Sequence, residues 1–283
     1  MEDLFPFFQN NESLSKGIQH SLSVQRIHFH IVQGLSLIHI FFQDVTFAYP
    51  GADEPVLSHI SFTAKRGQTT AFIGSTGSGK STLVNLIPRF YDVTEGAILV
   101  DGVDIRNVSQ KALREKIGYV PQKGVLFSGT VDSNIRYGRE TASQEQVWDA
   151  VVTAQAADFI EEKENGLHSE ISQGGTNVSG GQKQRISIAR ALVRQPEIYI
   201  FDDSFSALDF KTDAQLRKAL AAQTRESAVL IVAQRISTIL HADQIIVLDD
   251  GEMVGKGTHR ELLESCDVYR EIALSQLSKE ELA

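Results

Sequence analysis

The chain has 283 residues, of which 42% are hydrophobic and 22% are charged, and its formal net charge is −9. The apolar share can fill a core, and the acidic balance argues against a nucleic-acid-binding protein, which usually carries a basic stripe. The single cysteine, Cys266, excludes a disulfide framework and fits a reducing compartment.

Residues 1–40 differ from the rest of the chain, because they carry few charges and show no clear hydrophobic period. Within them Leu35–Ile40 reads Leu-Ser-Leu-Ile-His-Ile, which one reading frame of a common transposon-end sequencing adapter encodes. We therefore hypothesise that residues 1–40 are a chimeric join and that the natural domain covers residues 41–283. Resequencing the locus without that adapter tests this, and recovery of the same codons would contradict it.

From residue 41 onward, strand-like and helix-like segments alternate, which predicts an α/β fold with a mostly parallel sheet. The strands are short apolar runs rich in β-branched residues, as expected when a sheet is covered on both faces. The predicted strands are Thr70–Gly74, Glu197–Asp202, Ala228–Ala233 and Gln244–Asp249. The predicted helices are Lys80–Ile87, Ser143–Ala157, Gln182–Val193 and Thr212–Ala222.

The segment Gly74–Ser81 matches the phosphate-binding pattern G-x-x-x-x-G-K-[ST] without a mismatch, between a predicted strand and a predicted helix. Its glycines let backbone N–H groups face phosphate oxygens, and the helix N-terminus adds positive potential. Lys80 is predicted to reach the β- and γ-phosphates, and Ser81 to ligate Mg²⁺. The predicted nucleotide-binding residues here are Gly74, Ser75, Thr76, Gly77, Ser78, Gly79, Lys80, Ser81 and Thr82.

The predicted strand Glu197–Asp202 ends in an acid, and Asp203 follows it directly. We expect this strand to lie beside the P-loop strand, where Asp202 can hold Mg²⁺ through water. The alternative interpretation, that these acids only mark the exit of a strand, would be preferred if the P-loop were absent.

A second candidate anion site begins at Val178, where the chain reads Val-Ser-Gly-Gly-Gln before a predicted helix. One bound nucleotide does not need two separate anion-binding helix N-termini in one site. A head-to-tail dimer would give a role to both the P-loop and this second segment. Each chain would hold one nucleotide and cap the partner's with Ser179, Gly180, Gly181 and Gln182.

This segment resembles the signature motif of the ATP-binding cassette (ABC) family, with Val178 where leucine is usual, and the resemblance covers residues 41–283. It implies a P-loop NTPase core with a mostly parallel sheet, an antiparallel β edge near the N-terminus and an inserted helical subdomain at about 122–191. ATP and Mg²⁺ are the implied cofactors. By the same resemblance Tyr49 stacks on adenine, and Gln122 contacts Mg²⁺ and water and senses the membrane partner.

Two further segments, Leu126–Ile135 and Ser169–Gly175, look like the exporter branch of that family. Glu170 is similar to an acid that contacts a coupling helix there, and Ser206–Asp209 to the loop that crosses the dimer interface. The implied function is ATP-driven export, with the cassette at the cytoplasmic face of the cell membrane. No stretch of the chain is apolar enough for a membrane helix, so we expect a fragment whose intact gene encodes roughly six membrane segments upstream of residue 41.

Two positions depart from the family pattern. Asp203 stands where the family has its catalytic glutamate, and Gln234 where it has its switch histidine, while His241 lies too far along to replace it. The predicted catalytic residues are Asp203, Gln234 and Gln122. The two departures from the family pattern, at Asp203 and Gln234, are expected to affect ATP hydrolysis and to leave ATP binding intact. The combination resembles the degenerate-site subunit of a heterodimeric multidrug-type exporter, whose partner cassette is competent.

Two alternatives remain open at this point. One is a soluble ABC ATPase of translation or DNA repair, against which the acidic balance and the exporter-like Leu126–Ile135 segment speak. The other is a regulatory ATP-binding cassette with little turnover. Turnover by the mixed dimer, compared with turnover by this chain alone, separates the regulatory module from the exporter subunit.

Overall fold

The computed structural model describes residues 39–277. Most of the segment 1–40, and with it the hypothesis of a chimeric join, lies outside these residues. The last two residues of that segment, His39 and Ile40, open the first strand, and the Ile40 side chain is buried. Among the described residues, no helix has the length and hydropathy that a membrane span requires.

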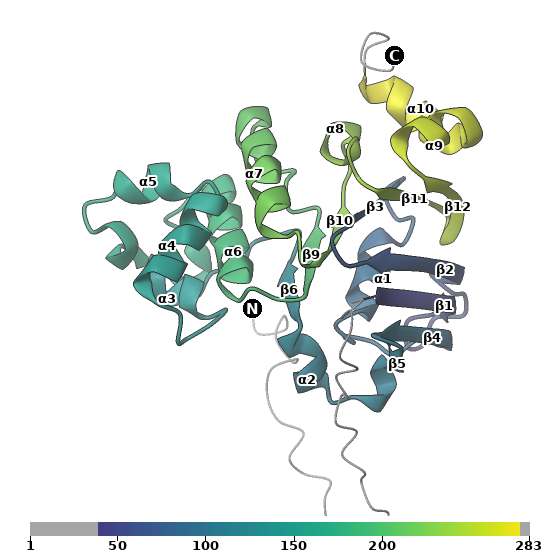
Figure 1. Cartoon of the computed structure of the whole chain (residues 1–283), viewed down its shortest axis with the longest axis horizontal. Helices are drawn as coiled ribbons and strands as arrows, with labels where there is room; N and C mark the ends of the chain where they lie inside the picture. The colour runs from purple at the N-terminus through teal and green to yellow at the C-terminus, as the bar shows by residue number, and fades with distance from the viewer. Residues whose placement is uncertain (1–38, 278–283) are drawn as a thin grey trace, which may run out of the picture. The chain divides into compact units, whose positions relative to one another are not determined.

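A six-stranded sheet forms the centre of the fold (Figure 1). Its order is β12 (Glu252–Gly257), β11 (Gln244–Asp249), β3 (Thr69–Gly74), β10 (Ala228–Val232), β9 (Ile198–Asp202) and β6 (Ile117–Val120). All neighbours are parallel except β12, which pairs antiparallel with β11. The predicted mostly parallel sheet is therefore confirmed, and each of the four predicted strands is one of its members.

One expectation about strand neighbours is wrong. We expected the strand that ends in Asp202 to lie beside the P-loop strand β3, but β10 lies between them. The two strand ends still meet, because helix α1 (Lys80–Leu86) follows β3 and packs against both β10 and β9. Side chains of α1 therefore reach the end of β9, although β10 lies between β3 and β9.

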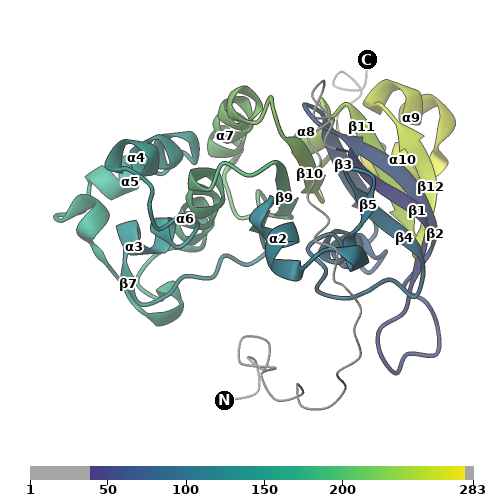
Figure 2. The ribbon, with the colours of Figure 1, turned by 60° about the horizontal axis from the view of Figure 1, so that its bottom comes forward.

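A second, antiparallel sheet is formed by strands from the N-terminal part of the described sequence, as expected (Figure 2). Its order is β2 (Leu57–Lys65), β1 (His39–Phe47), β4 (Glu95–Val100) and β5 (Val103–Asp104). The two sheets share one apolar core with α1, in which the Phe62 ring contacts Phe42 of the same sheet and Phe72 of β3 at centroid distances of 4.4 and 5.4 Å. This core holds the P-loop helix between the two sheets.

A helical lobe is inserted after β6 (Figure 1). It contains the helices α3 (Val131–Arg136), α4 (Gln144–Thr153), α5 (Ala157–Glu161) and α6 (Gly180–Val193), the short 3₁₀ helices η2 (Gly166–His168) and η3 (Gln173–Gly175), and the paired strands β7 (Gly129–Thr130) and β8 (Glu170–Ile171). Helices α3 and α4 both pack on α6. The inserted helical subdomain that the resemblance implied is therefore present.

The helix predicted over Ser143–Ala157 is shorter than expected. It ends at Thr153, because Gln155 adopts a left-handed φ of 55°. The N–H of Ala156 then donates to the Val151 carbonyl, and the N–H of Gln155 to the Val152 carbonyl, which is the Schellman ending of a helix. The apolar pattern of the sequence did not reveal this turn, because residues on both sides of it are buried.

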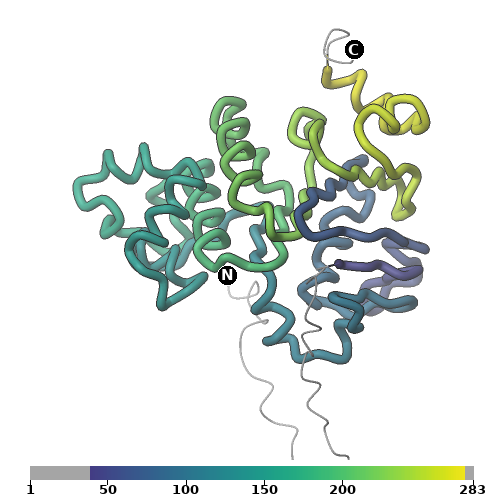
Figure 3. Tube along the Cα trace, in the orientation of Figure 1, coloured from purple at the N-terminus to yellow at the C-terminus, as the bar shows by residue number. Residues whose placement is uncertain are grey.

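The remaining helices complete the fold. A short 3₁₀ helix η1 (Ile105–Asn107) and α2 (Gln110–Glu115) lead into β6, while α7 (Phe210–Gln223), α8 (Ile236–Ile239), α9 (His259–Ser265) and α10 (Asp267–Gln276) follow β9. Buried side chains of α6, α7, α8 and α10 share one core with the face of the central sheet that α1 does not cover. The Cα trace in Figure 3 runs from the antiparallel strands to the helical lobe and back through α7 to α10.

Candidate nucleotide-binding site

The P-loop turns from β3 into α1 through backbone conformations that require glycine. Gly79, the residue before α1, has φ 93°, and a Cβ there would lie 2.6 Å from the Leu57 side chain. A Cβ on Gly74 would lie 1.9 Å from the Leu248 carbonyl oxygen. No side chain caps the N-terminus of α1. The loop therefore presents the helix N-terminus without a side-chain cap, as phosphate binding requires.

Lys80 is buried at the base of this loop, with 8% of its surface exposed. Its ammonium donates to the carbonyl oxygens of Gly74 and Ser75 at 3.0 and 2.6 Å and to the Ser78 hydroxyl at 3.1 Å. Burial lowers the pKa of Lys80, while Asp203 and Asp202 oppose that shift. A buried ammonium whose hydrogen-bond partners are neutral oxygens is well suited to gain an anionic partner.

Ser81 and Asp202 meet at the ends of α1 and β9. The Ser81 hydroxyl donates to Asp202 Oδ1 at 2.8 Å, and Asp202 is buried. Burial raises the pKa of Asp202, against the hydrogen bonds that it accepts from Ser81 and Tyr119. A hydroxyl and a carboxylate oxygen are hard donors of the kind that Mg²⁺ prefers, so these two residues fit the predicted metal position.

Two residues near this carboxylate, Tyr119 and Asn85, were not predicted from the sequence. The Tyr119 hydroxyl lies 3.4 Å from Asp202 Oδ2 and 2.8 Å from Asn85 Oδ1, to which it donates. Asn85 lies four residues after Ser81, so both residues project from one face of α1. That spacing was the available signal for Asn85, whereas only the tertiary fold brings Tyr119 to the site.

Asp203 is held between the two predicted glutamines. Its Oδ2 accepts from Gln122 Nε2 at 2.9 Å and from Gln234 Nε2 at 2.7 Å. An ionised carboxylate only accepts, so both amides must present their nitrogen to it. The backbone of Asp203 has a φ of 46°, a left-handed conformation that Asp tolerates better than most residues. The structure therefore brings all three predicted catalytic positions together.

A cavity of about 230 Å³ joins these parts. Its lining comes from the P-loop, from the loop after β6 and from the ends of β9 and β10. The lining residues are Gly74, Thr76, Gly77, Gly79, Lys80, Ser81, Thr82, Gln122, Asp203, Val232 and Gln234. The groups predicted to bind phosphate, to bind the metal and to act in catalysis thus face one space.

Tyr49 lies at the outer side of the P-loop helix. Its hydroxyl is 3.0 Å from the hydroxyl of Thr82, and its ring packs edge-on against Phe47 and Tyr91 at centroid distances of 4.9 and 5.2 Å. The ring is only partly buried. Its position next to the P-loop helix is compatible with the predicted adenine contact.

The predicted signature residues do not reach this cavity. Ser179 is the N-cap of α6 in the helical lobe, where its hydroxyl accepts from the Gln182 N–H at 3.2 Å and Gln182 Oε1 accepts from the Ser179 N–H at 3.0 Å. Ser179 and Gly180 are exposed. None of the residues that line the P-loop cavity comes from Ser179–Gln182. Within this chain the two candidate anion sites are therefore separate.

The two exporter-like segments lie side by side. Thr130 pairs with Glu170 and Gly129 with Ile171 in the β7–β8 pair, and the N–H of Gly174 donates to the Leu126 carbonyl. Glu170 is exposed. In the predicted interface loop, Asp209 caps α7 by accepting from the Thr212 N–H at 3.0 Å.

Comparison with known proteins places the chain among its relatives. A model of the ABC transporter family matches residues 57–206. An uncharacterized ABC transporter ATP-binding protein of Mycobacterium tuberculosis is 52% identical over 234 residues, which are 82% of this chain and 40% of that protein. A Staphylococcus aureus protein named for multidrug export, as an ATP-binding/permease protein, is 46% identical over 228 residues, or 81% of this chain and 39% of that protein.

Among solved structures, a bacterial Atm1-family ABC exporter with ATP bound superposes with a TM-score of 0.83 at 39% identity, covering 87% of this chain and 43% of that one. The chain thus spans less than half the length of these relatives. Its fold is the α/β fold of an ABC exporter's nucleotide-binding domain. The family model covers more than half of the chain, and the chain belongs to the ABC transporter family.

Proposed function

We propose that this chain is the ATP-binding subunit of an ABC exporter, which binds Mg-ATP in a head-to-tail cassette dimer and uses its hydrolysis to drive export across a membrane. The observation that carries the proposal is the cavity shared by Lys80, by Ser81 with its 2.8 Å bond to Asp202, and by Asp203. The export direction is supported by the similarity to the Atm1-family exporter and to the multidrug-export relative.

The residues present fit Mg-ATP. The loop that runs from Gly74 to Lys80 would bind the phosphates, and Tyr49 would pack on the adenine. Ser81 and Asp202 would hold Mg²⁺, with Gln122 beside them, and the ion would neutralise phosphate charge during transfer. For this the Ser81 hydroxyl must release Asp202 Oδ1 as a partner, because both atoms would then face the metal.

Within this frame, we propose that the chain's own site holds ATP but cuts it slowly. A general base must lie within about 2.6–3.2 Å of the attacking water, and Asp203 is one methylene shorter than glutamate. Gln234 donates one N–H of its side-chain amide to Asp203 Oδ2, which leaves the second N–H and the carbonyl oxygen for other neighbours. The second N–H could donate to a γ-phosphate, but a neutral amide cannot carry the positive charge that a protonated histidine would bring.

The dimer in this proposal follows from the separation of the two anion sites. Ser179 and Gly181 lie on α6, outside the P-loop cavity, so they would serve the ATP of a second cassette. A partner with the usual glutamate and histidine would then cycle while this chain's site stays closed, in a heterodimer. Attachment to the membrane, at its cytoplasmic face, would come from transmembrane domains that the longer relatives suggest lie upstream.

Nucleotide binding by the Lys80→Ala variant tests the basis of the proposal. The substitution removes a charge-assisted contact worth about 1.5–3 kcal/mol, which corresponds to roughly tenfold or more in ATP affinity. Lys256→Ala on β12, an exposed lysine outside the cavity, is the matched control and should bind like the wild type. Fluorescence titration with a labelled ATP analogue measures both, and unchanged affinity in Lys80→Ala would contradict the assignment.

A further inference from the structure

The switch segment, Gln234–Ile236, leads from the end of β10 into the first residue of α8. It carries Gln234, which lines the P-loop cavity and donates to Asp203. Between a strand and a helix, backbone groups have neither a sheet partner nor a helix partner, and the N-cap residue of α8, Arg235, makes no side-chain cap. The backbone of the switch segment therefore needs hydrogen-bond partners from elsewhere in the fold.

One side chain of the C-terminal helix α10 supplies two of these partners. Gln276 Nε2 donates to the Gln234 carbonyl oxygen at 2.9 Å, and Gln276 Oε1 accepts from the Ile236 N–H at 2.8 Å. Only this orientation of the amide satisfies both partners, because one is an acceptor and the other a donor. Gln276 thus holds the backbone on both sides of Arg235, which fixes the direction of the chain from which the Gln234 side chain projects.

Helix α10 is itself anchored in the core. Tyr269 and Ala273 are fully buried, in the same cluster of apolar residues as Ile236. The Tyr269 hydroxyl also lies 2.7 Å from Nδ1 of His259, on the neighbouring helix α9. Gln276 is exposed and lies three residues after Ala273, in the last turn of α10. The placement of the helix therefore determines where the Gln276 amide meets the switch segment.

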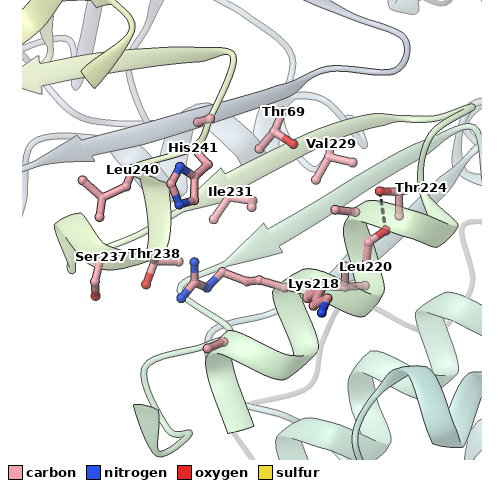
Figure 4. Close-up of a pocket in the computed structure, with 14 residues that line it drawn as sticks. Thr69, Lys218, Leu220, Thr224, Val229, Ile231, Ser237, Thr238, Leu240 and His241 are labelled. Carbon is pink, nitrogen blue, oxygen red and sulfur yellow. Dashed lines mark hydrogen bonds between the residues drawn. The ribbon is translucent and has the colours of Figure 1, made fainter. Parts of the chain in front are cut away.

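The other side of α8 faces a hollow of about 580 Å³ that separates it from α7 (Figure 4). Figure 4 shows Thr238 of α8 and Lys218 of α7 on opposite sides of this hollow. Besides α10, the loop after β9 contacts the switch segment, because the Arg235 guanidinium donates to the Ser206 carbonyl oxygen at 3.3 Å. Contacts from α7 thus do not fill this side of α8, which leaves α10 and the loop after β9 to hold the switch segment.

We propose that Gln276 is a positioning residue for Gln234, so that α10 determines how the switch position faces Asp203 and the ATP site. Loss of the Gln276 bonds would free the switch segment to move toward the hollow and would release the Gln234 amide from Asp203. The last helix of the domain would thereby be coupled to the nucleotide. The effect on ATP rests on the proposed function, whereas the positioning itself can be tested without nucleotide.

Nuclear magnetic resonance of the nucleotide-free chain, with isotope-labelled glutamine, tests the positioning directly. The side-chain amide signal of Gln234, identified by its loss in Gln234→Ala, should shift in Gln276→Met toward that of a glutamine in water. The Ile236 amide hydrogen should exchange about five- to tenfold faster, as expected when one hydrogen bond is lost. Gln223→Met is the matched control and should change neither signal, because Gln223 is exposed and ends α7 as Gln276 ends α10. Thermal unfolding of each variant shows that it is folded.

The release rate of a fluorescent ATP analogue from the same variants tests the consequence for the ATP site. A correctly placed Gln234 would donate its second N–H to the phosphates, so Gln234→Ala should release the analogue about three- to tenfold faster. Gln276→Met should have a similar effect, and the double variant should release the analogue no faster than Gln234→Ala alone. Effects that multiply in the double variant would mean that Gln276 acts independently of Gln234, against the proposal.

Two results in the nucleotide-free chain would overturn the positioning role. One is an unmoved Gln234 signal in a folded Gln276→Met, and the other is an equal shift in the control Gln223→Met. Failure of the wild-type chain to bind the ATP analogue would instead contradict the proposed function. The spectra without nucleotide would then still decide whether Gln276 positions Gln234, so the two failures remain distinguishable.

Discussion

The two helix N-termini of the predicted ATP sites differ in what already occupies them. At α1 no side chain caps the helix, and the nearby ammonium of Lys80 bonds only to neutral oxygens of the loop. At α6 a capping box between Ser179 and Gln182 uses two N–H groups. The N–H groups at the N-terminus of α1 therefore have no side-chain acceptor. At α6 the capping box already satisfies two N–H groups, and the N-terminal residues of that helix are exposed.

The same two regions differ in how far they depart from the family pattern. The signature region keeps Ser179, Gly180 and Gly181, and a Ser179 hydroxyl that accepts from Gln182 still has its own hydrogen to donate. The P-loop region keeps its phosphate and metal groups but has Asp203 and Gln234 at the predicted hydrolytic positions. We infer that binding is retained in both regions and that hydrolysis is weakened only in the chain's own site.

The largest expected effect comes from reversing that difference. Asp203→Glu combined with Gln234→His should raise hydrolysis at this chain's own site by about 10²–10⁴-fold, the usual worth of general acid–base help. The assay is single-turnover ATP cleavage in the dimer whose partner has lost its own catalytic glutamate. No recovery while ATP stays bound would place the defect elsewhere, for example in the partner's signature loop.

The opposite change should stop the partner's site. A Cβ on Gly181 would lie 3.3 Å from the Ala207 carbonyl oxygen, and the carboxylate of Gly181→Asp would face the γ-phosphate of the partner's ATP. Turnover by the dimer should fall by about 10²–10³-fold or more, as when a preorganised donor to the reacting anion is lost.

Nucleotide binding by the isolated chain is the control for Gly181→Asp. It should be unchanged, because none of the residues that line the P-loop cavity belongs to the signature segment Ser179–Gln182. Loss of binding in the isolated variant, with its thermal unfolding unaltered, would show that the head-to-tail arrangement is wrong.

A smaller effect should follow from the burial of Asp202. Burial raises the pKa of this carboxyl above its ordinary value of 3.8, so the folded protein keeps the proton at a pH where an exposed aspartate has lost it. Mg²⁺ requires the ionised form, and below the raised pKa its affinity should fall about tenfold per pH unit. The raised pKa also means that this group's contribution to stability declines as pH rises through that window.

The measurement is the Mg²⁺ dependence of ATP affinity as the pH is lowered, with folding followed in parallel. Asp202→Asn should bind Mg²⁺-ATP more weakly and should lose this pH dependence. If Asp202→Asn keeps the wild-type pH profile, another group controls the metal.

The sequence predicted those parts of the site that are local. Gly74–Ser81 is a contiguous motif, and the strands around it are short apolar runs. The motif and the apolar runs were therefore enough to predict the P-loop and these strands from the sequence. The contacts of Tyr119 with Asp202 and Asn85 join segments that are far apart in sequence, and no local pattern encodes them. The bond between Gln234 and Asp203 likewise depends on β10 and β9 being neighbours, whereas we had expected β9 to lie beside β3.

The smallest expected effect separates capping from ligand binding at α6. Gln182→Ala removes the 3.0 Å bond from the Ser179 N–H but keeps the Ser179 hydroxyl, so it should lower the free energy of unfolding by about 0.5–1 kcal/mol and change turnover by less than about threefold. Ser179→Ala loses a cap of similar or greater worth, about 0.5–2 kcal/mol, and also the hydroxyl that would reach the partner's phosphate. Its turnover should therefore fall well below that of Gln182→Ala at comparable stability. Urea unfolding and dimer turnover, measured on both variants, decide the point. Equal turnover in the two would mean that Ser179 only caps the helix, and the contrast between the two N-termini would then rest on Gly180 and Gly181 alone.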